Sequence, residues 1–93
     1  MRQTSIVSDP WKSTRNKQKH GIDSAEAATV FRDPLLHVMP DVAHSQEEER
    51  WLALGKSFRQ LLLGVVHSED GNRIRIISAR KAEPKERREY EQT

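Results

Sequence analysis

The sequence predicts an α+β domain with two N-terminal helices, a four-stranded antiparallel sheet and a short C-terminal helix. Three observations indicate this class: two helix-start signals near the N-terminus, strand-like periodicity through the middle, and a proline that opens a charged segment near the end. The chain has 93 residues, close to the usual size of one domain. We therefore expect residues 1–93 to form a single domain.

The first helix is predicted over residues 11–19. Asp9 is a favourable N-cap and Pro10 suits the first helical position. His20 and Gly21 follow, and glycine is the usual left-handed residue after a last helical turn. This segment is therefore expected to end at the glycine.

The second helix is predicted between Asp23 and Arg32. Glu26 stands three residues after Asp23, the spacing of a capping box, and the pair Asp33-Pro34 ends the helix. A third, C-terminal helix is predicted over residues 84–90, because a proline opens this charged segment.

Four strands are predicted between the second and third helices. The pair Asp70-Gly71 is a strong hairpin signal between the last two strands. Because the strands follow one another directly, apart from a polar loop over residues 41–49, we expect an antiparallel sheet. The strands are predicted over residues 35–39, 50–55, 60–67 and 73–81.

The last predicted strand, residues 73–81, carries the most informative pattern. Isoleucines alternate there with Arg73 and Arg75, which predicts one apolar and one basic face. The stretch contains four cations and no acid, whereas a solubilising surface usually mixes its signs. This strand is therefore predicted to face a nucleic acid.

Composition excludes several classes of function. The chain has no cysteine, so disulfides, thiolate nucleophiles and cysteine-based zinc sites are excluded. Its four histidines stand at no recognised metal-ligand spacing, and no glycine-rich phosphate loop is present, so neither a metal nor a nucleotide cofactor is expected. The N-terminal segment has no signal-peptide or membrane-span pattern, which favours the cytoplasm.

The average charge of the chain hides its distribution. Net charge is only +2, but basic clusters lie near both ends and an acidic stretch lies between them. The hydrophobic fraction of 34% is low and predicts a thin core, which a bound partner would help to stabilise. Trp11 and Trp51 are expected to act as core or interface anchors.

Three blocks of residues, covering nearly the whole chain in order, resemble the BrnT family of bacterial toxins. The first block contains Asp9-Pro10-Trp11-Lys12, Asn16, Lys19-His20-Gly21-Ile22, Glu26-Ala27-Ala28 and Val30-Phe31. The second and third are Glu49-Arg50-Trp51-Leu52-Ala53-Leu54-Gly55 and Ile74–Ala82 with Glu86–Glu91. The chain departs from the family pattern at Ser8 and Ser24, where the family usually has aromatic residues, so packing around the first helix is expected to differ.

The resemblance implies a RelE-like ribonuclease toxin of a type II toxin–antitoxin pair, which cleaves messenger RNA and stops translation. It also implies a partner, a ribbon-helix-helix antitoxin of the BrnA type, through which the complex would bind promoter DNA. RNA supplies its own nucleophile, the 2′-hydroxyl, so the protein needs no metal to attack the phosphodiester. It must instead align groups, neutralise phosphoryl charge and move two protons.

Four residues are candidates for catalysis, and each has a structural alternative. Arg80 could bind a phosphate or pair with a nearby acid such as Glu86. Arg50 could serve the same cleft or be neutralised by the adjacent glutamates. His20 could shuttle protons, although its place in the last turn of a helix explains it equally well, and Tyr90 could act as acid or base or only pack its ring.

Further cations are candidates for binding the RNA backbone. These residues are Lys12, Lys19, Arg73, Arg75 and Lys81. Binding and catalysis both favour fixed cations, so a non-catalytic module that binds RNA or a protein remains the alternative function.

Overall fold

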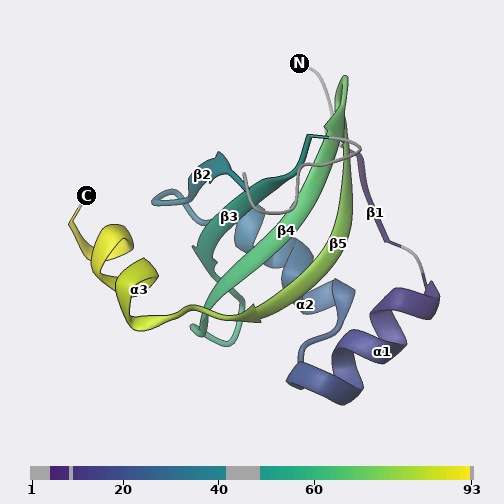
Figure 1. The fold of residues 1–93 in the computed structure, drawn as a ribbon, viewed down its shortest axis with the longest axis horizontal. Helices are drawn as coiled ribbons and strands as arrows, with labels where there is room; N and C mark the ends of the chain where they lie inside the picture. The colour runs from purple at the N-terminus through teal and green to yellow at the C-terminus, as the bar shows by residue number, and fades with distance from the viewer. Residues whose placement is uncertain (1–4, 9, 42–48, 93) are drawn as a thin grey trace.

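The computed structural model describes residues 5–8, 10–41 and 49–92 (Figure 1). Its five strands form one sheet in the order β1-β5-β4-β3-β2. The strands are β1 (Ser5–Ser8), β2 (His37–Pro40), β3 (Trp51–Lys56), β4 (Leu62–Asp70) and β5 (Arg73–Lys81). The helices are α1 (Pro10–His20), α2 (Ser24–Thr29), the 3-10 turn η1 (Val30–Arg32) and α3 (Pro84–Glu91).

The predicted α+β class is confirmed, but the prediction of a four-stranded, purely antiparallel sheet is wrong. β1 adds a fifth strand and runs parallel to β5, with Ser5 opposite Arg73 and Ser8 opposite Ile76. The segment is only four residues long and pairs with a strand almost seventy residues away. No local alternation or turn signal marks such a long-range pairing, so it could not be predicted from the sequence.

The four predicted strands pair as expected. β2, β3, β4 and β5 form consecutive antiparallel neighbours. The hairpin between β4 and β5 is confirmed, because Gly71 has a φ of +62°, a left-handed conformation that glycine adopts without a steric penalty. The acidic loop predicted before β3 falls largely on residues 42–48, outside the described part of the chain.

The helix-start signals are confirmed where they can be checked. Asp23 caps α2, its Oδ1 accepting a hydrogen bond from the Glu26 amide at 2.8 Å. The second hydrogen bond of the predicted capping box, from the Asp23 amide to the Glu26 carboxylate, is missing because that carboxylate binds Arg59 and Ser57 instead. α3 has a complete capping box between Glu83 and its third residue. The Asp9 cap of α1 lies outside the described residues.

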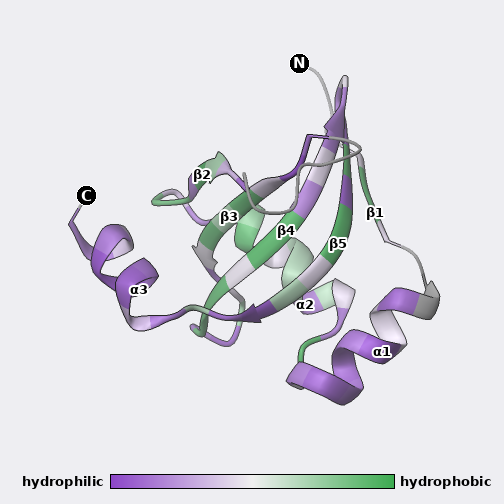
Figure 2. Ribbon diagram, viewed as in Figure 1, coloured by the Kyte–Doolittle hydropathy of each residue, from purple (hydrophilic) through white to green (hydrophobic). Residues whose placement is uncertain are grey.

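The core lies between α2 and one face of the sheet, which we call the helix-side face. Its buried residues are Ile22, Ala27, Val30, Ala53, Leu63, Val65, Ile76 and Ala79. In Figure 2 the central strands carry most of the hydrophobic colour, whereas α1 and α3 are mainly hydrophilic. α3 covers only one end of the other face, where Tyr90 packs on Leu54 and Leu62. Among the described elements, no other helix packs on that face.

The side chain of Asn16 fixes α1 to the sheet beyond the end of β1. Its amide donates to the Ala79 carbonyl at 2.9 Å, and its oxygen accepts from the Ala79 amide at 3.0 Å. It also donates to the Ile22 carbonyl at 2.7 Å. Asn16 thus replaces a neighbouring strand where β1 no longer pairs with β5.

A polar contact also joins the starts of the two N-terminal helices. The Ser13 hydroxyl donates a hydrogen bond to the Ser24 hydroxyl at 3.0 Å. Ser24 is one of the two positions where the family pattern usually has an aromatic residue. Among the described helices, none has the length and apolar character needed to cross a bilayer.

Candidate functional site

A β-bulge in β5 brings its arginines to one face of the sheet. Ile76 lies opposite His67 and Ser78 lies opposite Val66, so Ile77 is an extra residue in the ladder. Without the bulge, side-chain alternation would send Arg73 and Arg75 to one face and Arg80 to the other. With it, Arg75 opposite Ser68 and Arg80 opposite Gly64 share a face.

We call this surface the arginine face, and it consists of Arg73, Arg75 and Arg80 on the side of the sheet that α3 partly covers. Lys81 lies opposite Leu63 in the register and belongs to the helix-side face. Arg50 precedes β3, and its carbonyl accepts a hydrogen bond from the Asp41 amide at 2.9 Å. By alternation with Leu52, Arg50 falls on the side of the arginine face.

Arg80 is held by a two-pronged ion pair. Its two terminal nitrogens donate to the two oxygens of Glu86, at 2.7 and 2.9 Å. This pair lowers the pKa of the Glu86 carboxyl and raises the pKa of the Arg80 guanidinium. Glu86 also closes the capping box of α3 through the Glu83 amide at 2.8 Å. The predicted alternative for Arg80, a salt bridge to Glu86, is therefore present in the structure.

Gly64 makes room for the Arg80 side chain. A Cβ at this position would lie 3.1 Å from the nearest terminal nitrogen of Arg80 and 3.4 Å from its Cζ. The guanidinium thus lies directly over the backbone of β4, with its side chain 31% exposed. One terminal nitrogen also donates to the Lys81 carbonyl at 3.4 Å.

Tyr90 is placed as an anchor for α3. Its side chain is buried, and its hydroxyl donates to Asp33 Oδ2 at 2.6 Å. Burial and this hydrogen bond raise the pKa of Tyr90 to about 12. A phenol with that pKa gives up its proton poorly near neutral pH, which favours the packing interpretation of this residue.

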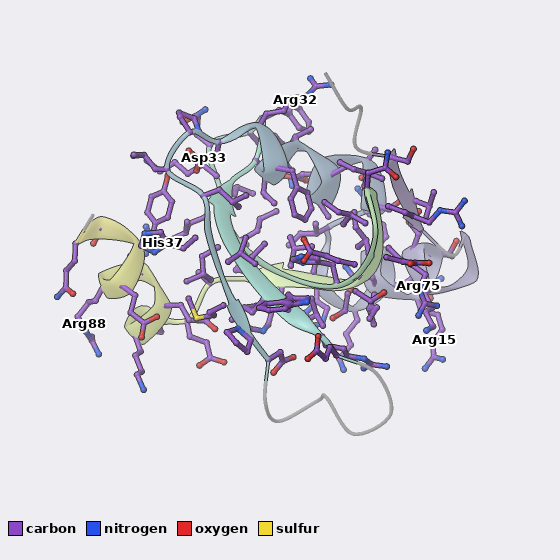
Figure 3. All side chains as sticks on the ribbon, turned by 90° about the horizontal axis from the view of Figure 1, so that it is seen from above. Arg15, Arg32, Asp33, His37, Arg75 and Arg88 are labelled. Carbon is purple, nitrogen blue, oxygen red and sulfur yellow. The ribbon has the colours of Figure 1, made fainter. Side chains whose placement is uncertain are left out.

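A second cationic site lies between α1 and β5, where a groove of about 500 Å³ opens. We call it the α1 groove. Ser78 lines it and, by register, also points to the side of the arginine face, so the two surfaces adjoin. Figure 3 shows Arg15 and Arg75 at the same end of the molecule. The cationic and titratable residues of the groove are Lys12, Arg15, Lys19 and His20.

Six of the nine sequence-predicted residues gather in two adjoining groups. Lys12, Lys19 and His20 line the α1 groove, while Arg73, Arg75 and Arg80 share the arginine face. Tyr90 lies near the far end of the sheet beside β2, where its ring is 6.2 Å from that of His37. No three His, Asp or Glu side chains converge as metal ligands in the described ranges.

Sequence reasoning missed the structural roles of three polar residues. Asn16 attaches α1 to β5 beside the site. The sequence signal for this role is that asparagine, a poor helix former, stands in the middle of the predicted helix. Glu26 is buried and pairs with Arg59 at 2.7 Å, although it had been expected only to cap a helix. His67 is also buried, packing edge-on against Phe31 with ring centroids 5.1 Å apart. None of these partners is near its residue in sequence.

Comparison with known proteins agrees with this architecture. The family described as "Ribonuclease toxin, BrnT, of type II toxin-antitoxin system" matches residues 9–86. Among solved structures, the ribonuclease toxin BrnT of Brucella abortus is similar, with a TM-score of 0.67 and 24% identity, over 87% of this chain and 99% of that one. Among curated proteins, none matches significantly. Because the family match covers most of the sequence, the chain belongs to the BrnT family of type II toxin–antitoxin ribonuclease toxins.

Proposed function

We propose that this protein is a metal-independent endoribonuclease that uses the 2′-hydroxyl of its RNA substrate as the nucleophile. One observation carries the proposal: the bulge at Ile77 places three arginines of one strand on the same face, next to the α1 groove. Guanidinium groups suit phosphates because their planar fork donates two hydrogen bonds at once. Held on a strand, they contribute charge without a large cost of reorganisation.

In this mechanism each cationic group has a separate task. Arg80, with its position held by Glu86, would neutralise the charge that builds on the phosphoryl oxygens. Arg73 and Arg75, which are exposed on the same strand, would hold the RNA backbone on one side. Lys12 and Lys19 of the α1 groove would hold the adjoining phosphates.

Proton transfer is assigned to His20 rather than to Tyr90. His20 lines the α1 groove, and an imidazole ring can serve as either a proton donor or a proton acceptor. The Tyr90 hydroxyl donates to Asp33 and has a pKa of about 12. Arg50 is kept as a second phosphate contact, since it precedes β3 on the side of the arginine face.

The wider biology follows from family membership. We propose a BrnA-like ribbon-helix-helix antitoxin as the neutralising partner, and binding of promoter DNA by the pair through that antitoxin. The expected outcome of cleavage is arrest of translation in the cytoplasm. A RelE-like ancestry of the sheet is part of the same proposal and is supported by the resemblance of the three sequence blocks.

The test is RNA cleavage by the purified protein in EDTA, beside the Arg80→Ala variant. Removing Arg80 leaves the Glu86 carboxylate without its partner, which could destabilise the fold. The double variant Arg80→Ala/Glu86→Gln removes this unpaired charge and therefore tests the loss of Arg80 in a protein that should still fold. Arg32→Ala is the matched control, because this exposed arginine lies far from Arg75 in Figure 3. Cleavage by the parent and the control, but by neither Arg80 variant, supports the proposal.

A non-catalytic RNA-binding module is the second candidate, because the arginine face would serve binding equally well. RNA binding by the parent without products would favour this module and contradict the nuclease mechanism. Cleavage that requires a divalent ion would contradict metal independence alone.

A further inference from the structure

The two most exposed large apolar side chains of the described residues line the same groove. Phe58 is 67% exposed and Leu35 is 53% exposed, and both border a hollow of about 450 Å³. Single exposed apolar residues are ordinary on a protein surface, but two that converge on one hollow indicate a contact site. We call it the Leu35–Phe58 groove, and Tyr90 also lines it.

Phe58 is held rigidly although it is exposed. It lies in the turn between β3 and β4, and its amide donates to Thr29 Oγ1 at 2.9 Å. On either side of it, Ser57 donates to the buried Glu26 carboxylate at 2.7 Å and Arg59 pairs with the same carboxylate at 2.7 Å. A surface aromatic whose backbone is already fixed loses little conformational entropy when it is covered.

The rim of the groove is cationic. Asp33 lies in the groove, but its oxygens already accept hydrogen bonds from the Leu35 amide, the Lys56 amide and the Tyr90 hydroxyl, at 2.9, 2.8 and 2.6 Å. The exposed side chains of Arg32 and Lys56 are the other charged groups that line it. The surface therefore offers apolar anchors next to positive charge.

This groove is separate from the surface assigned to RNA. In Figure 3, Arg32 and Asp33 lie well away from Arg15 and Arg75. A partner bound here would contact Tyr90, the residue that anchors α3.

We propose that the Leu35–Phe58 groove docks an amphipathic segment of the antitoxin, with an apolar side chain against Phe58 and Leu35 and carboxylates facing Arg32 and Lys56. The inference rests on the proposed function, which supplies a protein antitoxin as the partner. Aromatic anchors in fixed positions typically carry much of the energy of such interfaces. The low hydrophobic fraction of the chain, 34%, agrees with a protein that gains from being covered.

The test uses the small protein encoded by the open reading frame beside the toxin's own. Its affinity for the full chain is measured by calorimetry for the parent, Phe58→Ala, Leu35→Ala and Lys56→Glu. Val38→Ala is the control, because Val38 is 45% exposed but does not line the groove. We expect each groove variant to weaken binding by about tenfold or more, and the control to stay within about twofold.

Thermal melts and RNA cleavage by each variant separate the possible failures. Retained melting temperature and retained cleavage show that a groove variant is folded and has lost only the partner. If the parent binds but the groove variants bind equally well, the docking site is wrong while the toxin–antitoxin pairing stands. If the parent does not bind the neighbouring protein, the pairing itself fails and the inference fails with it. Concentration-dependent self-association of the parent that Phe58→Ala abolishes would overturn the proposal in favour of a second copy of this chain.

Discussion

Glu86 holds the guanidinium of Arg80, so changing it separates binding from positioning. Glu86→Gln keeps the shape of the side chain and an oxygen that can accept from the Glu83 amide, so the cap of α3 should survive. Removing a negative charge beside Arg80 should tighten RNA binding. The slope of the logarithm of the affinity against the logarithm of the salt concentration should become steeper by about one. Loss of the fixed guanidinium should slow single-turnover cleavage by about tenfold, since misplacement effects reach about 100-fold.

Fluorescence anisotropy at several salt concentrations and single-turnover cleavage measure the two effects of this variant. Glu91→Gln is the control, because this exposed residue lies on the same helix. Weaker RNA binding by Glu86→Gln would show that the carboxylate does not compete with phosphate for Arg80.

Tyr90→Phe tests whether the phenol is an anchor or a catalyst. The change removes the hydrogen bond to the Asp33 carboxylate, which should cost about 1.5–3 kcal/mol of unfolding free energy, while cleavage should stay near the parent rate. The pKa of Tyr90 is raised to about 12 in the folded state, whereas it is near 10 in the unfolded chain. The contribution of Tyr90 to folding stability is therefore fully present at any pH below about 10. Parent stability should therefore fall as pH rises from 10 to 12, and the variant should lack that part of the decline. Denaturant titrations across this range measure it; a variant that has lost cleavage at pH 7 would restore the catalytic interpretation.

At the scale of elements, the attachment of α1 depends on one side chain. Asn16→Ala leaves the amide and carbonyl of Ala79 without their partner at the edge of β5. Each buried polar group left unpaired costs about 1–3 kcal/mol, so we expect a loss of roughly 2–4 kcal/mol in unfolding free energy. In the Asn16→Ala variant, hydrogen exchange should show that the backbone amides of α1 lose more protection, relative to the parent, than those of β4.

Gln18→Ala is the control for the attachment of α1, because this exposed residue of the same helix should change stability by less than about 0.5 kcal/mol. Equal stabilities of the two variants would mean that packing alone holds α1.

The same elements show what the sequence could and could not predict. Local signals such as Asp23, Pro84 and Gly71 placed the helix starts and the hairpin, because caps and turns depend on nearby residues. β1 and the bulge at Ile77 depend on partners distant in sequence, so neither was predicted. The alternation of residues 73–76 correctly separated the arginines from Ile74 and Ile76. That Arg80 joins Arg73 and Arg75 on one face required the structure.

At the scale of the whole molecule, the three carboxyl groups whose pKa values are lowered, Glu26, Asp33 and Glu86, favour folding above acidic pH. The carboxyl pKa of Glu26 is lowered mainly by its hydrogen bond from Arg59, and that of Glu86 mainly by Arg80. Burial alone would raise the pKa of Asp33, but hydrogen bonds, first from the Lys56 amide, lower it overall. A lowered folded-state pKa means that stability is present above the unfolded value and is lost as pH falls through the folded value. These carboxylates predict unfolding at pH below about 4.

His67 should add an earlier step to the loss of stability in acid. Burial lowers the pKa of this ring, against the opposing effect of Glu69, whose carboxylate lies 3.8 Å from Nε2. The unfolded chain therefore takes up a proton near pH 6.5 that the folded protein resists, so stability should begin to fall below that pH. His67→Phe keeps an aromatic ring against Phe31 and removes the titrating group, so its unfolding free energy should be flat between pH 6.5 and 5 while the parent declines. Urea titrations at half-unit pH steps measure the difference, and parallel curves for the two proteins would show that His67 is not the group that responds.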